Sequence, residues 1–271
     1  METTISSTHE ITVRSAVVIK RFRSWDRGEQ LREWTGLTLL AAHTPDLAPV
    51  PVAADLASDP PTVTMSRLAA EPLGRSPLTR LQTEAVAAAV TRLHRAIPAY
   101  ELDRLPPRIG EPAALASQVR ARTDQQTPTA DPLVVRAFAA GSAWIRLLPQ
   151  HVLADDVPPV FGHADGHLAN YLWDGTRIRM VDFEDSGRSD LAFEVAELVE
   201  HLSAWIEGAV DVPLLIAMFD LTLAERTRLR ELRRLCAFLW LLMLLPDGPA
   251  HERNPAGTAR RQAERLLALL G

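Results

Sequence analysis

Apolar and polar positions along the first part of the chain predict a small sheet covered by one helix. Short runs of β-branched and apolar residues, separated by turn residues, are typical of strands. We expect strands at about residues 10–14, 16–22, 50–53 and 62–65. Between the second and third strand, apolar residues recur at helical spacing over residues 27–42. Asp26 is the expected N-cap of this helix, with Glu29 as its capping-box partner.

Most of the remaining chain follows the helical period. Ser76 and Pro77 are typical of the first residues of a helix. The longest apolar run, residues 235–245, has 11 residues and is too short to cross a bilayer, so we expect a buried helix there. The expected helices cover about residues 76–97, 112–122, 132–148, 190–207, 212–221, 224–245 and 258–270.

Residues 161–194 interrupt these helices with a segment rich in carboxylate, imidazole and amide side chains. Apolar runs at residues 159–161 and 178–181 predict strands, and residues 171–173 predict another that ends in a hairpin turn at residues 174–175. This arrangement would bring Asp165, Asn170 and Asp182 to the same end of a small sheet. Oxygen ligands of this kind suit a hard cation such as Mg²⁺.

Two other interpretations of this segment stay open. His163, Asp165, His167 and Asp182 are residue types that bind zinc, as in a metallohydrolase, and His201 is a further candidate ligand. Loops also collect aspartate, glycine and serine for their turn geometry alone, which would make the segment a solvated acidic loop. The apolar strand that leads directly to Asp182 argues against the second interpretation.

Composition limits the class of protein. Apolar residues make up 47% of the 271 positions, which is typical of a globular chain and not of a disordered one. The net charge of −5 argues against a general nucleic-acid binder and suits a cationic ligand. Cys236 is the single cysteine, so no disulfide framework can form, and the N-terminal residues lack a secretory signal pattern. We expect a cytoplasmic protein without nucleic-acid or membrane partners.

Lysine is almost absent from the chain. Lysine and arginine together number 29, and Lys20 is the single lysine, at the end of the apolar run 16–19. A compact ammonium that must fit between phosphates and a carboxylate cannot be replaced by a guanidinium. Lys20 is therefore a candidate phosphate ligand, with an ordinary surface lysine as the alternative.

The order and spacing of these residues resemble the motifs of the aminoglycoside phosphotransferase family, whose members are relatives of protein kinases. The family's catalytic loop, His-Gly-Asp-x-His-x-x-Asn, corresponds to HADGHLAN at residues 163–170. Its metal motif, Asp-Phe-Gly, corresponds to DFE at 182–184, and its trailing motif to DSGRSDL at 185–191. VVIK at 17–20 is similar to the lysine strand of kinases. Ala164 and Glu184 replace glycines of the family pattern, and the glycine-rich nucleotide loop is missing.

The resemblance implies an α+β, bilobal protein-kinase-like fold. Residues 1–68 would form a small lobe of sheet and one helix that binds the nucleotide, and residues 69–271 a larger, mainly helical lobe with the catalytic and substrate-binding groups. Because 19 residues precede Lys20, we expect a shortened N-terminal sheet and a reduced nucleotide loop. The implied reaction moves the γ-phosphoryl group of ATP or GTP, with Mg²⁺, to a hydroxyl of a small molecule.

The resemblance also assigns roles near the nucleotide. Lys20 would contact the phosphates, and Glu33 would pair with it, with Glu29 as the alternative partner. Ser6 and Ser7 are the candidates to replace the missing glycine loop, because they offer hydroxyls and backbone amides.

At the reaction centre, Asp165 would accept or orient the proton of the acceptor hydroxyl, while Asn170 and Asp182 would hold the magnesium ion. His163 is expected to fix the loop by packing and hydrogen bonds. Asp190 is expected to accept backbone hydrogen bonds from the catalytic loop.

Acceptor binding is the least determined part. Glu197, Glu200 and His201 share a face of the helix expected after Asp190, where they would meet a cationic substrate such as an aminoglycoside, or else form a solvated face. By resemblance the leading acceptor is an aminoglycoside or another antibiotic, which would make the protein a resistance or self-protection enzyme. Choline, homoserine and sugar-like metabolites are alternatives, and so is a kinase-like protein that binds a ligand without catalysis.

Overall fold

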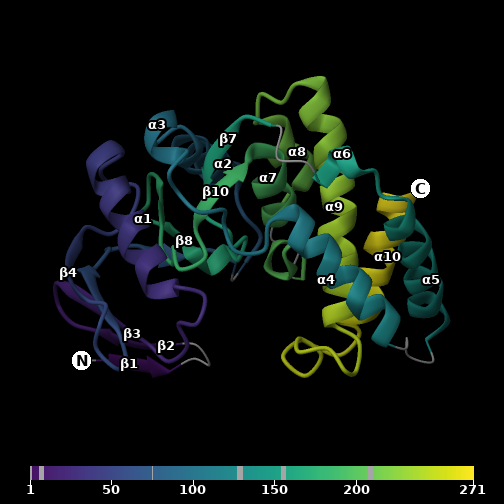
Figure 1. Cartoon of the computed structure of the whole chain (residues 1–271), viewed down its shortest axis with the longest axis horizontal. Helices are drawn as coiled ribbons and strands as arrows, with labels where there is room; N and C mark the ends of the chain where they lie inside the picture. The colour runs from purple at the N-terminus through teal and green to yellow at the C-terminus, as the bar shows by residue number, and fades with distance from the viewer. Residues whose placement is uncertain (1, 6–8, 75, 127–130, 154–156, 207–209) are drawn as a thin grey trace.

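A computed structural model describes residues 2–5, 9–74, 76–126, 131–153, 157–206 and 210–271. Figure 1 shows a sheet with one helix on the N-terminal side and a larger, mainly helical part on the C-terminal side. This combination confirms the predicted α+β class.

The N-terminal sheet has the strand order β1-β2-β3-β5-β4, with all neighbours antiparallel. Two of its strands precede Lys20, so the shortened sheet predicted from the sequence is wrong in strand number. The pairing of Ile5 with Glu10 explains how both strands fit, because a connection of a few residues joins them. The strands are β1 (Glu2–Ile5), β2 (His9–Val13), β3 (Val17–Phe22), β4 (Pro51–Asp55) and β5 (Thr62–Ser66).

Helix α1 (Glu29–His43) begins two residues later than predicted. Gly28, at a φ of 77°, occupies the N-cap position in place of Asp26, without a side-chain cap. The carboxylate of Glu29 accepts hydrogen bonds from the backbone N–H and the guanidinium of Arg27 instead of completing a capping box. The left-handed glycine turn therefore sets the direction of α1.

A glycine allows α1 to pack closely on the central segment of the chain. A Cβ atom at Gly36 would lie 3.2 Å from Phe183 Cβ and 3.1 Å from Ser186 Oγ, which is tighter than ordinary van der Waals contact. Phe183 directly follows Asp182 and is fully buried. The close approach at Gly36 thus connects the helix of the N-terminal sheet to the segment that carries Asp182.

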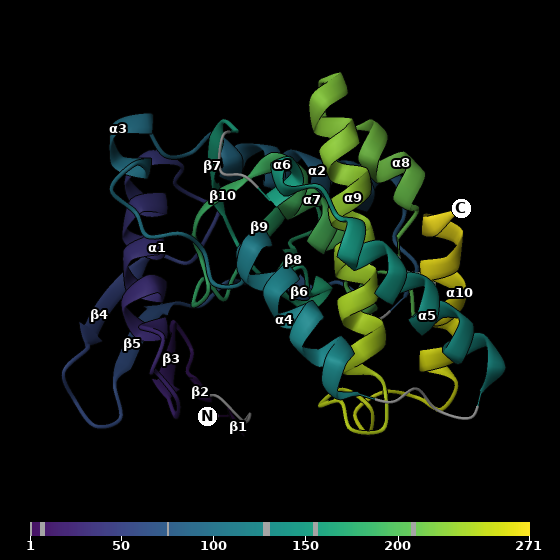
Figure 2. The same ribbon diagram turned by 45° about the vertical axis from the view of Figure 1, so that its right-hand side comes forward.

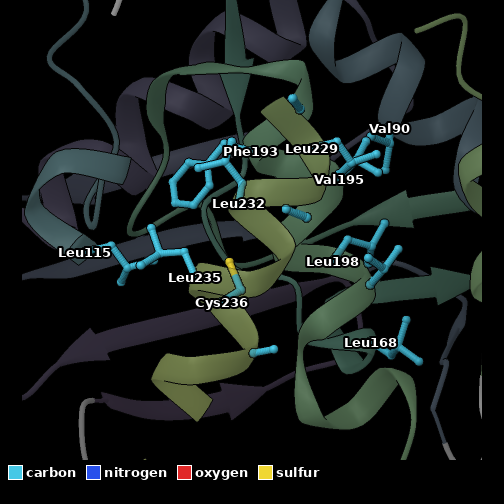
Figure 3. Close-up of a cluster of buried hydrophobic side chains, with 14 of the residues drawn as sticks. Val90, Leu115, Leu168, Phe193, Val195, Leu198, Leu229, Leu232, Leu235 and Cys236 are labelled. Carbon is cyan, nitrogen blue, oxygen red and sulfur yellow. The ribbon is translucent and has the colours of Figure 1, made fainter. Parts of the chain in front are cut away.

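The C-terminal part is organised around α9, which packs against α7, α4 and α10 (Figures 1 and 2). Figure 3 shows buried side chains of the core in this part, among them Phe193, Val195 and Leu198 of α7 and Leu229, Leu232 and Leu235 of α9. Cys236 lies in this core, as the sequence predicted. The helices are α2 (Arg80–His94), α3 (Ala99–Leu102), α4 (Pro112–Gln125), α5 (Pro132–Leu147), α6 (Gln150–Leu153), α7 (Leu191–Glu200), α8 (Val212–Ala217), α9 (Leu223–Met243) and α10 (Thr258–Leu270), with 3-10 turns η1 (Leu168–Asn170) and η2 (Leu202–Ala204).

Two predicted helix boundaries are wrong for identifiable reasons. Helix α2 begins at Arg80 and not at Pro77, because Thr79 and Gln82 form a capping box. Each of the two side chains accepts a hydrogen bond from the backbone N–H of the other residue. Helix α7 ends at Glu200, where His201 caps the following 3-10 turn η2. No helix among the described residues combines the length and the apolar character needed to cross a membrane.

Two small sheets lie in the central segment, where the sequence predicted one. The hairpin β8 (Tyr171–Trp173) and β9 (Ile178–Met180) is present as predicted and pairs with β6 (Glu71–Pro72). Strand β7 (Pro159–Gly162) pairs instead with β10 (Gly187–Asp190). The catalytic-loop residues lie between β7 and β8, and Asp182 lies between β9 and β10.

Candidate active site

Lys20 lies buried on β3, the central strand of the N-terminal sheet, with its ammonium among carboxylates. It is 2% exposed. Lys20 Nζ lies 3.0 Å from Glu33 Oε2 and 2.8 Å from Glu184 Oε2, and it also contacts Asp182 Oδ1. Burial alone would lower the pKa of Lys20, but the neighbouring carboxylates, Asp182 first, raise it well above its usual value. The ammonium therefore stays charged, and it links the small sheet to the central segment.

The structure has the ion pair between Lys20 and Glu33 that the sequence predicted. Glu33 is fully buried on α1, and burial raises its pKa although Lys20 opposes this. Glu29, the alternative partner, binds Arg27 and does not reach Lys20. Glu33, which anchors Lys20, therefore lies one helical turn after Glu29, which orders the start of α1.

Asp182 follows β9 in an unusual backbone conformation. Its φ of 72° lies in the left-handed region, which few residues other than glycine adopt. Burial raises the pKa of Asp182, but the charge and hydrogen bond of Lys20 outweigh this and hold it below its usual value. The carboxylate is therefore ionised.

Asp165 and Asn170 lie next to each other on the loop between β7 and β8. Asn170 Nδ2 donates to Asp165 Oδ2 at 2.8 Å, and the backbone N–H of His167 donates to Asp165 Oδ1 at 2.9 Å. The backbone carbonyl of Asn170 accepts from the N–H of Val181 at 3.1 Å. This bond places Asn170 beside the residue that precedes Asp182, so Asp165, Asn170 and Asp182 come together as the hairpin predicted.

His163 braces this arrangement. Its Nε2 lies 2.7 Å from the carbonyl oxygen of Val181, and its Nδ1 lies 2.9 Å from the carbonyl oxygen of Asp165. The ring therefore connects the backbone on both sides of the centre, which is the role that the sequence predicted for it.

A buried charge network under the loop was not predicted. Glu194 on α7 accepts from the backbone N–H groups of His163 at 2.9 Å and Ala164 at 3.3 Å. Arg108 binds Glu194 at 3.0 Å, Glu197 at 2.5 and 2.9 Å, and the carbonyl oxygen of Ala164 at 3.1 Å. Ala164 has a φ of 71°, which costs a residue with a Cβ atom roughly 1–2 kcal/mol. The network holds the loop in that conformation.

The role predicted for Asp190 belongs to Glu194. Asp190 caps α7 through a hydrogen bond from Phe193 N at 3.0 Å and pairs with Arg228 at 2.8 Å, so its carboxylate does not reach the catalytic loop. Both acids lie near the start of the same helix, and Glu194, one turn further along, faces the loop.

A family model described as "Phosphotransferase enzyme family" matches residues 9–232, which is most of the chain. The chain belongs to this family. The match includes both the lysine strand and the loop from His163 to Asn170, and it confirms the family resemblance predicted from the motifs. No curated protein matches the chain.

Solved structures share the fold of this phosphotransferase at low sequence identity. A choline/ethanolamine kinase family protein from Mesorhizobium loti has a TM-score of 0.64 and 19% identity, over 97% of this chain and 85% of its own. A spectinomycin phosphotransferase in complex with ADP and spectinomycin has 0.62 and 13%, over 98% and 88%. An aminoglycoside phosphotransferase from Streptomyces rimosus has 0.59 and 18%, over 89% and 92%. These likenesses confirm the predicted protein-kinase-like fold.

The donor set of the phosphotransferase fits a magnesium ion. Asn170 uses its NH₂ group toward Asp165, so its amide oxygen stays available, and Lys20 contacts one of the two oxygens of Asp182. Among the described residues, Asp182, Glu33 and Glu184 place three carboxylates around one ammonium. Oxygen ligands with excess negative charge are what a hard divalent cation prefers.

The zinc and solvated-loop interpretations do not fit. The described residues contain no group of three histidine, cysteine or acidic side chains placed to hold a metal, which a zinc site built by the protein needs, whereas Mg²⁺ completes its ligand shell with waters and phosphates. Both ring nitrogens of His163 face carbonyl oxygens, and His167 Nδ1 accepts from the N–H of Ala169 at 3.0 Å. His163 and Asn170 are buried, which excludes a solvated loop.

A pocket of about 480 Å³ opens beside η1, η2 and the end of α9. We call it the histidine pocket. Its lining includes His167, His201, Ser203, Trp240, Met243 and Arg253. The backbone N–H of His167 bonds to Asp165, so the pocket adjoins the candidate reaction centre. Its volume is in the range of sites for small molecules.

Of the predicted substrate contacts, only His201 lines this pocket. Glu200 is fully buried, and its two oxygens bind Arg233 at 2.7 Å and Arg265 at 2.6 Å, so the prediction that it meets a substrate is wrong. Glu197 is bound bidentately by Arg108. Helical spacing placed the acids on one face, but arginines neutralise both of them: Arg108 from the loop before α4 binds Glu197, and Arg233 of α9 and Arg265 of α10 bind Glu200.

Some functional candidates lie beyond sequence reasoning, and others beyond the described residues. Ser6 and Ser7, the proposed substitutes for the glycine loop, lie outside the described residues. Arg108, Trp240 and Arg253 were missed because they belong to no motif and come close to the centre only through the fold. The sequence analysis treated Glu184 only as a replacement for a glycine of the family pattern. Its position two residues after Asp182 could have indicated that its carboxylate also contacts Lys20.

Proposed function

We propose that the protein transfers the γ-phosphoryl group of ATP or GTP to a hydroxyl of a small molecule. The observation that carries this proposal is the contact of Lys20 with both Glu33 and Asp182, residues from the small sheet's helix and from the central segment. Family membership supports the same chemistry. In this proposal residues 1–68 form the nucleotide-binding lobe and residues 69–271 the catalytic lobe.

The residues present divide the work of such a transfer. Lys20, held by Glu33, would bind nucleotide phosphates once they compete with the carboxylates for its ammonium. Asn170 and Asp182 would hold Mg²⁺, which neutralises charge on the phosphates when it is bound. Because the transition state is loose, positioning and charge neutralisation matter more than covalent chemistry by the protein.

Asp165 would orient the acceptor hydroxyl. Its carboxylate is fixed by hydrogen bonds from His167 N and Asn170 Nδ2, so it can accept the hydroxyl proton in one defined direction. The acceptor oxygen forms a bond to the γ-phosphorus, the bond from that phosphorus to the β–γ bridging oxygen breaks, and the nucleoside diphosphate leaves. The proton passes from the hydroxyl to Asp165 and then to solvent.

The solved relatives support two acceptor classes. The names of some describe spectinomycin and aminoglycoside phosphotransferases, and another describes a choline/ethanolamine kinase family protein. An antibiotic acceptor would make the protein a resistance or self-protection enzyme, and a metabolite acceptor such as choline, homoserine or a sugar would make it a metabolic kinase. A nucleoside triphosphate cosubstrate favours the cytoplasm as the place of action.

The test is triphosphate consumption across a panel of hydroxyl compounds with Mg²⁺. We predict that Asp165→Ala lowers turnover at least about 100-fold, the range for a positioned acid–base group. Asp124→Ala, at an exposed aspartate on α4, is the matched control and should turn over normally. If wild type and Asp165→Ala are equally inert while nucleotide still binds, the protein is a non-catalytic ligand-binding relative.

A further inference from the structure

The backbone fixes which ring nitrogen of each imidazole in the histidine pocket acts as a hydrogen-bond acceptor. The N–H of Ala169 donates to His167 Nδ1 at 3.0 Å, and the N–H of Ser203 donates to His201 Nδ1 at 3.1 Å. A nitrogen that accepts from a backbone N–H carries no proton, so we assign the proton of each neutral ring to Nε2. Burial lowers the pKa of His201 to about 4, so this ring is neutral at physiological pH. Both rings are hydrogen-bond donors at Nε2.

The orientation of His201 is coupled to the catalytic loop. The N–H of Leu168 donates to Ser203 Oγ at 2.9 Å, which leaves the single hydroxyl proton of Ser203 to point at His201 Nδ1, 2.8 Å away. The rings of His167 and His201 lie 4.9 Å apart, and His201 packs edge-on against Trp240 at the same separation. The pocket and the loop that carries Asp165 therefore form one hydrogen-bonded unit.

Negative charge is missing from the described lining of this pocket. Arg253 is the one side chain with a full charge among the described residues that line it, and no described carboxylate lies within ion-pair distance of Arg253. The acids of α7 that could have faced a cation are bound elsewhere, Glu197 by Arg108 and Glu200 by Arg233 and Arg265. Away from Asp165, which adjoins the pocket, an ammonium group there would meet an arginine and two N–H donors.

The rest of the lining is apolar. Trp240 and Met243 from the end of α9 lie opposite the two histidines, together with Leu202, Ile206 and Ala250. An indole next to aliphatic side chains favours a flat or aliphatic surface on the ligand. The pocket thus has a donating polar end beside Asp165 and an apolar remainder.

We propose that the phosphoryl acceptor is a hydroxyl compound without positive charge. Its hydroxyl lies at Asp165, neighbouring oxygen atoms accept from the Nε2–H groups of His167 and His201, and its apolar part lies on Trp240. An acidic group on the acceptor, where present, is bound by Arg253. This proposal depends on the proposed function for its hydroxyl chemistry, and it excludes the polycationic aminoglycosides that the family resemblance put first.

The charge preference of the pocket can be measured without knowing the acceptor. Iodide and caesium quench indole fluorescence by collision, and the difference between wild type and Trp240→Phe isolates the signal of Trp240. Relative to free tryptophanamide at low ionic strength, we expect Trp240 to favour iodide over caesium at least 2-fold. Arg253→Glu should abolish this preference, whereas Arg146→Glu, at an exposed arginine of α5, should leave it unchanged. Equal quenching or a preference for caesium in the wild type overturns the proposal.

A matched pair of alcohols tests the same preference in the reaction. Choline and its uncharged carbon analogue dimethylbutanol have the same shape and differ in charge, and we expect the higher kcat/KM with the analogue. In a wider panel, neutral glycosides, nucleosides and hydroxy acids should be phosphorylated in preference to aminoglycosides. Faster turnover of choline or of an aminoglycoside overturns the inference and leaves the proposed function standing.

Loss of the proposed function gives a different result. If neither ATP nor GTP binds in a manner that depends on Lys20, phosphoryl transfer is wrong, while the quenching of Trp240 still reports whether the pocket excludes cations. If nucleotide binds but no compound of either panel is phosphorylated, the quenching result alone decides the charge of the ligand.

Discussion

The two neighbourhoods that meet at Asp165 are built from opposite kinds of side chain. On one side Lys20 lies among the carboxylates of Glu33, Asp182 and Glu184, and burial makes each of these charges depend on the others. On the other side the histidine pocket is mostly apolar. Burial keeps His201 neutral, and the Nδ1 atoms of His167 and His201 both accept from backbone N–H groups. The first neighbourhood is suited to phosphates and a cation, and the second to an uncharged molecule.

The two sides also differ in whether the family motifs supply their residues. The charged side uses residues of the family motifs, and in the proposed function it binds the nucleotide. The neutral side uses Trp240, Arg253 and His201, which lie outside those motifs, and the acceptor differs between members. Substrate class should therefore be read from the lining of the pocket and not from the motifs.

The largest effect is expected from removing the charge at Lys20. Lys20→Met should lower kcat/KM by about 1000-fold, since loss of one preorganised charge contact commonly costs 100- to 1000-fold. Lys20→Arg should recover little, because a planar guanidinium does not fit a site shaped for an ammonium. The measurement is the initial rate over a range of nucleotide concentrations, which gives kcat/KM for the nucleotide.

The neighbouring residue on the same strand is the control for this change. Arg21 follows Lys20 on β3 and is exposed, so Arg21→Met should leave kcat/KM within about 2-fold, as expected for a weak surface ion pair. Equal losses for both variants would mean that β3 matters for folding and not for phosphate binding, and the contrast between the two sides of Asp165 would disappear.

The second-largest effect is expected from Arg108, whose charge network with Glu194 and Glu197 lies under the catalytic loop. Arg108→Met leaves Glu194 and Glu197 buried without their partner, and breaking such a pair costs about 3–4 kcal/mol of the free energy of unfolding. Chemical unfolding measures this loss. Arg104→Met, at an exposed position of the same loop, is the control and should have little effect.

A positioning role for Arg108 predicts more than instability. Adding Glu197→Gln to Arg108→Met removes an unpaired charge and should recover part of the stability. The hydrogen bond from Arg108 to the carbonyl of Ala164 stays lost, so kcat should remain low while KM for nucleotide is close to normal. Full recovery of kcat together with stability would reduce Arg108 to a structural residue.

Sequence reasoning identified the charged side because its geometry is local. The hairpin β8–β9 places Asn170 and Asp182 next to strand ends, and the helical period of α1 places Glu33 one turn after Glu29. The contacts of Glu33 and Asp182 with Lys20 agree with the order of elements that the family resemblance implied. The fold class was predictable for the same reason, since the first 66 residues form strands around one helix, α1, and the remainder is mainly helical.

Sequence reasoning failed where long-range pairing decides. Glu197 and Glu200 share a helical face, as predicted, but arginines 33 to 89 positions away in sequence bind them, which no periodicity reveals. Asp190 and Glu194 are both acids near the start of α7, and only the packing of Arg228 and Arg108 determines which one supports the catalytic loop. The N-terminal sheet was underestimated because β1 and β2 are too short to give a clear alternation.

The smallest effect is expected from the neutral imidazole of His201, measured through its pH dependence. The pKa of His201 is lowered to about 4 by burial, while the unfolded chain has a usual histidine pKa of about 6.5. The unfolded chain therefore binds a proton that the folded chain does not, so the stability is complete above about pH 6.5 and is lost as the pH falls toward 4. Between pH 7 and pH 5 this loss in the free energy of unfolding amounts to about 2 kcal/mol.

The variant His201→Asn tests this pH dependence. It keeps an acceptor for the N–H of Ser203 and cannot titrate, so its free energy of unfolding should fall less than that of wild type over this interval. His94, buried with a pKa also lowered to about 4, titrates in both proteins and cancels in the difference. Parallel pH profiles for wild type and His201→Asn would mean that His201 is already charged or hydrated in the folded protein, and the pocket beside Asp165 would then not be the neutral counterpart of the Lys20 cluster.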